Sequence, residues 1–473
     1  MLLEVRIKNF RSIEKEQVFS MLTCDNNKTN LDPESGNVEE CDGYKFGINS
    51  VIFNQGRSCI EVRKTATIYG ANGSGKTNFI LAMSLIQRLL GHWGDENKGV
   101  TIDWSFFQSK KPSTIVWSFI LPNSQEIFHY KIQLAIGTIL LEELKNANNE
   151  VIFSRKYDKK TKNYRYDMPA QQIPKYLTSK VAVASMKANL QNQSEENQRL
   201  VEDSLVFNML EVSKAITDQQ TLFVQTCGVR QSIEKMQEIV HFFNPLKFVL
   251  RAPILNYHDV NLYYSDLNGS LINMYAEDEL QSKQNTVNNR LVQNSNTFSK
   301  YRTIFEQIGA GDIDHWSYKK RNDGTYEFYS YKNYNGKTYK YDLYNHESSG
   351  TKRFACYYGV LHLLEQNGGG VLLIDELDAH FHPLLIIELL EYVNNKNLPI
   401  QIIATLHNTA VLRKSILELD QIHFVEKNDQ ASEIYSLADF DSITNYEQEN
   451  LESTYLKGSF GAIPHIDYLD FCS

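Results

Sequence analysis

Apolar side chains recur with two different periods in the first part of the chain. Residues 2–8 (LLEVRIK) alternate between apolar and polar positions and predict a strand, and residues 64–69 predict a short strand that ends at Gly70. In residues 78–90 the apolar positions have helical spacing, so a helix is expected directly after the second strand. The order strand, glycine, helix is typical of an α/β fold.

The pattern changes twice before the middle of the chain. From residue 115 to 153 the alternation predicts an antiparallel meander, broken by a turn at 145–150, whereas the polar residues 22–50 predict an exposed insertion. Residues 170–245 have helical spacing without sustained heptads, so they predict an inserted helical lobe rather than a long coiled coil. The Asn- and Gln-rich residues 280–300 predict an exposed loop or helix.

The last part of the chain returns to an α/β pattern. Asp323-Gly324 and Asn335-Gly336 lie between aromatic, alternating runs and are typical of type I′ hairpin turns. The elements expected after them are a helix at 351–366, a strand at 371–375, a helix at 384–394, a strand at 400–405, a helix at 408–416 and a strand at 421–425. The chain is therefore divided into an N-terminal half (1–169), an inserted lobe (170–310) and a C-terminal half (311–473).

The strongest chemical signal is the stretch GANGSGKT at residues 70–77, between a predicted strand and a predicted helix. Its glycines let backbone N–H groups surround phosphate oxygens at a helix N-terminus, which favours anions. Lys76 is expected to reach the β- and γ-phosphates of ATP, and Thr77 to bind Mg²⁺. The candidate nucleotide-binding residues here are Gly70, Asn72, Gly73, Ser74, Gly75, Lys76, Thr77 and Asn78.

A second signal is the apolar strand VLLI, which ends in Asp375 and Glu376. Carboxylates at the carboxyl end of a parallel strand lie where ligands bind in α/β sheets. Asp375 is expected to hold Mg²⁺ through water, and Glu376 to act as the general base for the attacking water. Such a strand alone is often structural, but the phosphate loop in the same chain favours the catalytic interpretation.

Composition narrows the setting of this site. The net charge of −9 argues against a basic surface that covers the protein and binds nucleic acid. The six cysteines contain no CxxC pair, which predicts reduced thiols and no zinc site. No run of about 18 apolar residues and no signal peptide is visible, so a cytoplasmic protein without a membrane span is expected.

Some patterns leave two interpretations open. Basic and aromatic residues alternate in 155–166 and in 318–340, which suits nucleic-acid contacts and equally suits the solvated face of a hairpin. His380 and His382 could be taken for a metal pair, although His382 followed by proline also suits a helix start.

These motifs together resemble those of an ABC-type ATPase of the SMC, RecF and OLD grouping. More narrowly, the chain resembles the stand-alone AAA/ABC ATPases of bacterial abortive-infection and phage-defence operons, including RloA/AbiLii-type proteins and the ATPase subunit of PARIS. The resemblance covers about residues 1–150 and 340–466. It rests on IKNFRS at 7–12, IYGANGSGKTN at 68–78, ESSGTKRF at 347–354, LLIDELDAHFHP at 372–383, TLHN at 405–408 and YLKGSFGAIP at 455–464.

The resemblance implies an α/β fold: a split ABC-type ATPase head, that is, a P-loop NTPase, with an antiparallel β subdomain and an inserted helical lobe. It implies that ATP is held between two copies, so a head-to-head homodimer at least is expected. The residues it adds to the site are Asn9, Phe10 and Arg11 near the nucleotide, Ser349 and Gly350 in the signature loop, Asp378 at the dimer seam, His407 as the γ-phosphate sensor and, by position only, Gln108 at Mg²⁺. Thr351, Lys352 and Leu406 depart from the common motifs, so slow turnover is expected.

The function implied by the resemblance is that of an ATP-driven sensor or scaffold in antiphage defence. No nuclease motif is visible, so a separately encoded effector, such as a nuclease, is the expected partner, and a phage protein is a candidate trigger. The alternative is a RecF- or SMC-like DNA-repair ATPase, against which the acidic balance of the chain argues. A nucleotide-binding subunit of a transporter is disfavoured by the IKNFRS strand and the inserted lobe.

Overall fold

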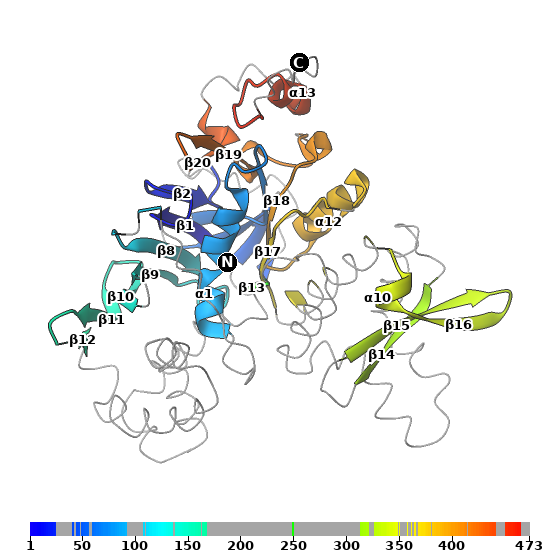
Figure 1. The fold of residues 1–473 in the computed structure, drawn as a ribbon, viewed down its shortest axis with the longest axis horizontal. Coiled ribbons are helices and arrows are strands. Elements are labelled where there is room, and N and C mark those ends of the chain that lie inside the picture. Colours follow the sequence, from blue (N-terminus) through cyan, green and yellow to red (C-terminus); the bar gives the residue numbers. More distant parts are fainter. Residues whose placement is uncertain are drawn as a thin grey trace, which may run out of the picture. The chain divides into compact units, whose positions relative to one another are not determined.

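The computed structural model forms two compact units (Figure 1). The first unit comprises Met1–Arg251, Gly368–Asp378 and Ile386–Ser473, and the second comprises Ala252–Asn367 and Ala379–Leu385. The structure describes residues 1–24, 40–41, 44–47, 49–55, 59–91, 107–108, 110–135, 138–161, 163–167, 248–249, 313–320, 326–348, 350, 357, 361, 364–365, 368–379, 381–413, 415–440 and 450–464. The predicted helical lobe and the polar stretch 280–300 lie outside the described residues, except for residues 248–249. The predicted three-part division of the chain stays a prediction.

A six-stranded sheet forms the centre of the first unit, with its strands in the order β13-β17-β18-β7-β19-β20. Its members are β7 (Thr65–Tyr69), β13 (Phe248–Val249), β17 (Gly370–Ile374), β18 (Ile400–Thr405), β19 (Ile422–Asn428) and β20 (Ala431–Ser436). All neighbours are parallel except β19 and β20. Every residue of β7, β17 and β18 is buried, as expected for parallel strands covered on both faces.

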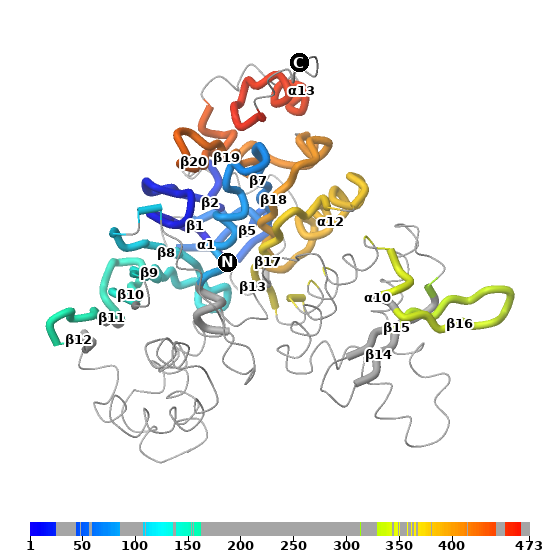
Figure 2. Tube along the Cα trace, viewed as in Figure 1, coloured from blue at the N-terminus to red at the C-terminus, as the bar shows by residue number. Residues whose placement is uncertain are grey.

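The segments around these strands confirm most of the predicted α/β elements. Helix α1 (Lys76–Gly91) follows β7, and helix α12 (Pro383–Asn395) lies between β17 and β18 in the sequence. Strands β7 and β18, which come from opposite ends of the chain, lie side by side (Figure 2). None of the described helices combines the length and the apolar character that crossing a bilayer requires.

A seven-stranded antiparallel sheet confirms the predicted meander and extends it. Its order is β12-β11-β10-β9-β8-β1-β2. The strands are β1 (Leu2–Lys8), β2 (Gln17–Ser20), β8 (Ser113–Ile120), β9 (Ile127–Ala135), β10 (Thr138–Asn146), β11 (Val151–Asp158) and β12 (Asn163–Asp167). The predicted turn is closed by a bond from Asn146 N to Glu150 O, while β10 itself continues to Asn146.

Part of the predicted insertion is ordered as strands. The small antiparallel sheet β3-β4-β5-β6 consists of Glu40–Cys41, Tyr44–Gly47, Ser50–Asn54 and Cys59–Arg63. The expectation of an exposed insertion up to residue 50 was therefore wrong for β4, because Tyr44 packs against Phe53 in the buried core. Residues 25–39 lie outside the described part.

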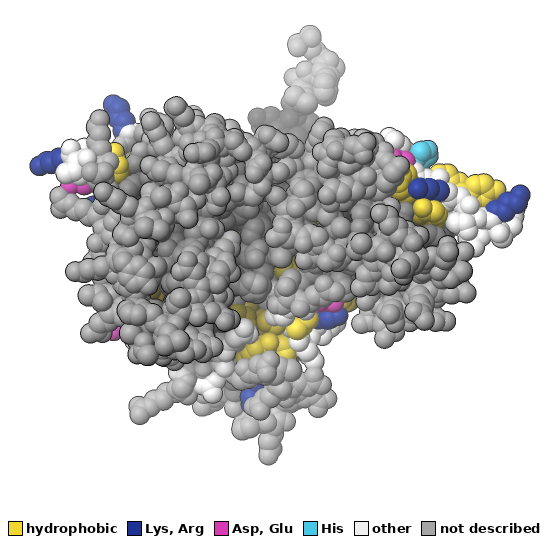
Figure 3. All heavy atoms as spheres, turned by 90° about the horizontal axis from the view of Figure 1, so that it is seen from below, with side chains coloured by type: hydrophobic (Ala, Val, Ile, Leu, Met, Phe, Trp, Pro, Cys, Tyr) yellow, Lys and Arg dark blue, Asp and Glu magenta, His cyan; other side chains and the backbone are white. Residues whose placement is uncertain are grey.

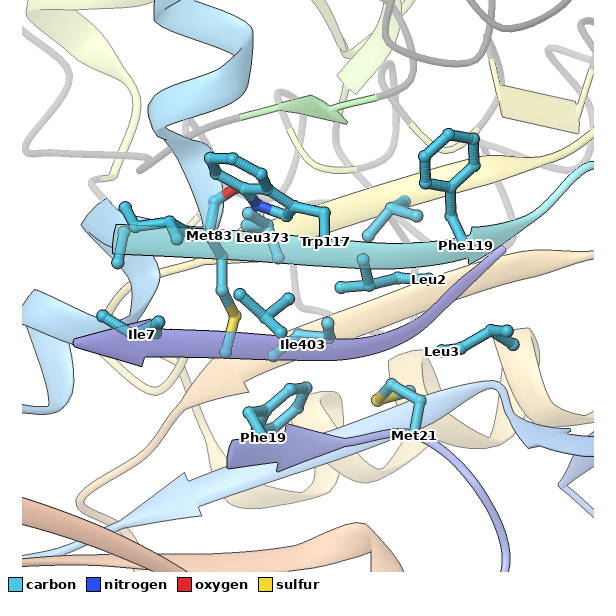
Figure 4. Packing of buried hydrophobic residues seen from close by; sticks show 14 of the residues in the cluster. Leu2, Leu3, Ile7, Phe19, Met21, Met83, Trp117, Phe119, Leu373 and Ile403 are labelled. Atoms are coloured by element: carbon cyan, nitrogen blue, oxygen red, sulfur yellow. The ribbon is translucent and has the colours of Figure 1, made fainter. Parts of the chain in front are cut away.

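One hydrophobic core joins these sheets and α1 (Figure 4). Trp117 of β8, Met83 of α1 and Leu373 of β17 belong to it, and Trp117 Nε1 donates to Met83 O at 2.9 Å. Leu2 and Ile403 bring β1 and β18 into the same cluster. Burial of such side chains contributes about 1.5–3 kcal/mol each, so this core holds β7 and β17 against the rest of the unit.

The second unit contains the sheet β14 (Ile313–Lys320), β15 (Tyr326–Tyr334) and β16 (Lys337–Asp342), followed by α10 (Leu343–His346). Asn335 and Gly336 have φ values of 49° and 74°, which confirms the type I′ turn between β15 and β16. Asp323-Gly324 lies outside the described residues. Figure 3 shows basic and apolar side chains at the surface where this hairpin lies.

The predicted helix at 408–416 was wrong. Among the described residues of this stretch, only the 3₁₀ helix η3 (Thr409–Val411) forms: the Asn408 side chain caps its start, and it ends because Leu412, at ψ 73°, leaves the helical region. Strand β20 and helix α13 (Leu451–Leu456) were not predicted. Of the predicted helix at 351–366, residues 357, 361 and 364–365 are described and are helical.

A buried lysine links β7 to the end of α12. Lys64 Nζ donates to Asn394 O at 2.9 Å and to Lys396 O, and it lies 5.5 Å from the centre of the Phe46 ring. These carbonyls favour the ammonium, but burial outweighs them and, with the charge of Lys396, lowers the pKa of Lys64 to about 7.

We expect this lysine to make stability depend on pH. Because the folded-state pKa lies below the usual value of 10.5, the unfolded chain binds the extra proton between about pH 7 and 10.5. Stability therefore rises with pH across that window, and the full cost of burial is present below pH 7. Urea unfolding at a series of pH values should show that wild type gains up to about 1.4 kcal/mol per pH unit relative to Lys64→Met.

The exposed Lys45 on β4 offers a matched control, because Lys45→Met should leave the pH dependence of wild type unchanged. If wild type and Lys64→Met showed the same dependence of unfolding free energy on pH, Lys64 would be charged in the folded protein.

Candidate functional site

The phosphate loop connects β7 to α1 and can form only with glycine at two positions. A Cβ on Gly70, at φ 151°, would lie 2.3 Å from Val425 O of β19. A Cβ on Gly75, at φ 107°, would lie 2.2 Å from the Ser432 hydroxyl oxygen and 2.8 Å from that of Ser12. The loop is therefore pressed against β19 and β20, which fixes the backbone N–H groups that precede α1.

Lys76 is buried at the base of this loop. Its Nζ donates to Gly70 O at 2.8 Å and to Ala71 O at 3.1 Å. Burial lowers the pKa of Lys76, and the negative charges of the carboxylates that follow β17 act in the opposite direction. These carboxylates are Asp375, Asp378 and Glu376. The structure therefore brings the phosphate loop and the acidic strand together, although they are far apart in the sequence.

Thr405, the last residue of β18, orients the two acids. Its hydroxyl donates to Asp375 Oδ1 at 2.8 Å and accepts from Glu376 N at 2.7 Å. Leu377 N also donates to Thr405 O at 3.0 Å. Glu376 has a φ of 54°, a conformation that costs a non-glycine residue about 1–2 kcal/mol, and these bonds hold it there. The predicted strand 371–375 included Asp375, whereas β17 ends at Ile374 and Asp375 lies just after it.

Asp378 fixes the loop that carries His407. Its Oδ2 accepts from His407 N at 2.6 Å and from Asn408 N. Residues 406–409, the switch loop, are in this way tied by side chain to the segment that carries Asp375 and Glu376. Leu406 N donates to Ile68 O at 3.0 Å, so the same loop also contacts β7.

The turn at residues 9–14 lies against the phosphate loop. Asn78 Nδ2 donates to Ser12 Oγ at 2.7 Å, and Arg11 Nη1 lies 3.4 Å from Asn78 Oδ1. Ser432 Oγ donates to Ser74 O at 2.5 Å, and it lies 2.7 Å from Ser12 Oγ, whose hydroxyl can donate to it. The structure thus places the predicted residues Arg11, Asn78 and Ser74 together.

Other predicted residues of this turn have structural partners. The Phe10 side chain is part of the hydrophobic core. Asn9 exchanges bonds with the Gln108 backbone, since Gln108 N donates to Asn9 Oδ1 at 2.8 Å and Asn9 Nδ2 donates to Gln108 O at 3.1 Å. The Gln108 side chain donates to Glu14 Oε1 at 2.6 Å. Its assignment to Mg²⁺ stays a prediction.

The predicted signature loop belongs to the second unit. Ser349 lies outside the described residues, and Gly350 is helical. Glu347, just before the loop, accepts from Ser330 Oγ at 2.7 Å and from Lys332 Nζ at 3.1 Å. These two contacts fix the position of Glu347 on β15.

The open question of a histidine metal pair is partly resolved. His382 Nδ1 accepts from Leu384 N at 3.3 Å at the start of α12, and His380 lies outside the described residues. Within the described ranges, no group of three or more His, Cys, Asp or Glu side chains could hold a metal ion.

Three residues of the site were missed by sequence reasoning. Thr405 stands two residues before His407, so its position at the end of a predicted strand was a usable signal. Ser12 ends the motif IKNFRS, but Ser432 carries no signal of its own, because its contact with Ser12 depends on β20 lying beside the turn at 9–14.

Comparison with protein families gives one match. Residues 231–413 match the family model "AAA domain, putative AbiEii toxin, Type IV TA system". The matched segment contains β17 and the switch loop but not the phosphate loop. It supports an AAA-type ATPase domain, whereas the narrower resemblance to RloA/AbiLii-type proteins and PARIS stays a prediction. Among curated proteins, no relative matches the chain.

Solved structures with a similar chain path include heads of SMC proteins. The SMC head bound to the C-terminal winged-helix domain of ScpA has 14% identity and a TM-score of 0.41, with 92% of this chain and 97% of that chain covered. The SMC head from Thermotoga maritima has 12% identity and a TM-score of 0.33, with 92% and 98% covered. A head with coiled coil and joint from Pyrococcus yayanosii has 12% identity and a TM-score of 0.37, with 97% and 99% covered. At these TM-scores the similarities carry no argument about function.

We expect Thr405→Val, which replaces the hydroxyl by a methyl group of similar size, to loosen the positions of the two acids. The variant removes the hydrogen bonds of the Thr405 hydroxyl to Asp375 Oδ1 and from Glu376 N, which should lower the free energy of unfolding by about 1–3 kcal/mol. If the site hydrolyses ATP, misplaced acids should lower the turnover number by roughly ten- to hundredfold. Steady-state turnover and thermal unfolding measure the two effects.

Thr405→Ser is the matched control, because it keeps the hydroxyl and should remain close to wild type. If Thr405→Val turned over ATP as fast as wild type, the positions of the two acids would not depend on this hydroxyl.

Proposed function

We propose that the first unit binds ATP with Mg²⁺ and hydrolyses it. The observation that supports this most directly is the burial of Lys76 beneath a glycine-rich loop, in the field of Asp375, Glu376 and Asp378. A buried cation between a phosphate loop and an array of carboxylates suits an anion that carries a metal ion. The match to an AAA-type family model supports the same activity.

The residues of the phosphate loop fit a triphosphate. Gly73 is open, since a Cβ there would meet nothing within 4 Å, so the tip of the loop leaves room for a ligand. The Lys76 ammonium, which bonds to two loop carbonyls, can exchange these bonds for charge-assisted bonds to phosphate oxygens.

The donor set also fits Mg²⁺. Thr77 offers a hydroxyl and Asp375 a carboxylate, and oxygen ligands are those that Mg²⁺ prefers. Asp375 has one oxygen bonded to Thr405, so its orientation is fixed before a metal ion binds. When bound, Mg²⁺ neutralises charge on the phosphates.

Hydrolysis requires a base and a group that responds to the γ-phosphate. In this proposal Glu376 accepts the proton of the attacking water, and its backbone N–H is held by Thr405. His407 contacts the γ-phosphate from the switch loop, where Asp378 holds its backbone. Neither Glu376 nor His407 has to move far, because each closely follows the end of a buried strand, β17 or β18.

The proposal includes a dimer of two heads. Ser349 and Gly350 would contact ATP bound to the partner copy, with Asp378 at the seam, as the resemblance implies. Within one copy, Ser330 and Lys332 of β15 bind Glu347, which precedes these residues in the sequence.

We further propose that ATP-driven closure of these heads controls a separate effector, such as a nuclease, in antiphage defence. The family description names an AbiEii toxin of a toxin–antitoxin system, and this supports a role in abortive infection. A phage protein would then be the trigger.

Two variants separate ATP binding from ATP hydrolysis. Lys76→Ala should lose ATP binding, since the buried cation is removed. Glu376→Gln should keep ATP but turn over roughly 10²–10⁴-fold more slowly, because it lacks the base. Turnover assays and light scattering with and without Mg-ATP should show that Glu376→Gln accumulates a larger, nucleotide-bound species.

Glu391→Gln on α12 changes the same functional group away from the site and should match wild type in both assays. If wild type bound ATP while Glu376→Gln changed neither turnover nor size, Glu376 would not be the base.

The proposed role in defence can be tested in cells. Cells that express the chain with its neighbouring genes should resist phage or arrest growth on infection, and Lys76→Ala should abolish this effect. Plaque counts with and without the operon measure it. Equal phage sensitivity in both strains would reject the defence role, and DNA-stimulated ATPase activity of the purified chain alone would favour the DNA-repair alternative.

A further inference from the structure

Residues 450–464, the α13 segment, pack against strands that carry the proposed ATP site. The Tyr455 ring stacks on Phe424 of β19 at 5.2 Å between centroids and lies 6.2 Å from Tyr69, the residue that precedes the phosphate loop. Tyr455 OH donates to Ala462 O at 3.0 Å, and Tyr435 OH of β20 donates to Phe460 O at 2.8 Å. The segment is therefore anchored mainly through aromatic side chains.

One polar bond connects this segment to the switch loop. Thr409 Oγ1 donates to Glu452 Oε1 of α13 at 2.7 Å. Thr409 follows His407 and Asn408, whose backbone N–H groups are both held by Asp378. Two carboxylates therefore accept hydrogen bonds from the switch loop: Asp378 from the backbone of His407 and Asn408, and Glu452 from the side chain of Thr409.

From this arrangement we propose that Glu452 is a positioning residue of the ATP site, which sets the orientation of His407 through Thr409. The inference rests on the proposed function and assigns to the α13 segment a part in hydrolysis that none of the sequence motifs gives it. Glu452 touches neither nucleotide nor metal in this proposal; it acts only on the loop that does.

Anchoring of α13 does not need Glu452. The helix has its own cap, since Asn450 Oδ1 accepts from Glu452 N at 3.1 Å, and Tyr455 supplies its packing. The Glu452 carboxylate therefore bonds to the switch loop and not to its own helix.

The buried Tyr69 hydroxyl gives independent support. Burial raises the pKa of Tyr69 well above its usual range, and the charges of Asp378 and Glu452 raise it further. Both carboxylates that hold the switch loop therefore lie near the same buried hydroxyl.

The test compares variants that remove the Thr409–Glu452 bond with variants that keep it. Glu452→Ala and Thr409→Val should lower kcat for ATP about three- to tenfold, the effect of one lost hydrogen bond, while KM and the affinity for a fluorescent ATP analogue stay within about twofold. Glu452→Gln keeps an acceptor oxygen and Thr409→Ser keeps the hydroxyl, so both should restore kcat. The double variant should be no slower than the worse single variant, because both changes remove the same bond.

Ser453→Ala, one residue along α13, controls for general damage to the helix and should match wild type. If Glu452→Ala lowered the thermal midpoint but left kcat per folded protein unchanged, Glu452 would be structural only and the inference would be overturned. If Glu452→Gln were as slow as Glu452→Ala, the bond to Thr409 would not be the cause and the inference would equally fail.

Failure of the proposed function is distinguishable from failure of this inference. Without ATP turnover by wild type itself, both fall together. With turnover by wild type and equal kcat in Glu452→Ala, the function stands and only the role of Glu452 is lost.

Discussion

The parallel pairing of β18 with β7 on one side and β17 on the other is the constraint on which the site depends. It sets Thr405 opposite Ile68 and Ala404 opposite Ile374, so the ends of all three strands meet at one edge of the sheet. A slip by one residue would turn every side chain of β18 to the other face and would take the Thr405 hydroxyl away from both acids. In strands that are buried on both faces the apolar pattern alone does not prevent such a slip, because most positions are apolar or small.

Buried polar side chains specify the register that the apolar pattern leaves open. Gln401, at the other end of β18 from Thr405, accepts from Leu2 N at 2.6 Å and donates to Leu2 O and Arg63 O at 3.0 Å each. Gln421 donates to Thr65 O at 3.0 Å and to Thr65 Oγ1 at 2.6 Å, which fixes the start of β7. Each of these amides would be left unsatisfied in any other register, at a cost of about 1–3 kcal/mol. The geometry of the site is therefore set by polar groups distributed along β7 and β18.

Local patterns predicted the phosphate loop, the acidic strand and the central strands. In each case the spacing of apolar residues, with or beside a short motif, is enough to indicate the element. They failed where a contact between distant segments decides the outcome. The apolar positions of 408–416 have helical spacing, yet Asp378 binds the N–H groups of His407 and Asn408, and the chain turns after Val411. The Ser12–Ser432 contact joins segments from opposite ends of the chain, and α13 docks on Phe424 of a strand that is separate from it in the sequence, so no local pattern could indicate either contact.

Hydrogen bonds in both directions connect the loops after β17 and β18, so we expect a ligand that moves one loop to move the other as well. Glu376 N and Leu377 N bond to Thr405, and the N–H groups of His407 and Asn408 bond to Asp378, so each loop supplies acceptors for the other. Displacement of His407 by a bound phosphate would stretch the bonds to Asp378, and Asp378 lies two residues from Glu376. In the proposed mechanism, a rearrangement at His407 would in this way be transmitted to Glu376 over a few covalent bonds. Because the loop after β18 is also bonded to Glu452, the α13 segment can influence the same movement, although Glu452 itself lies outside the motifs found in the sequence.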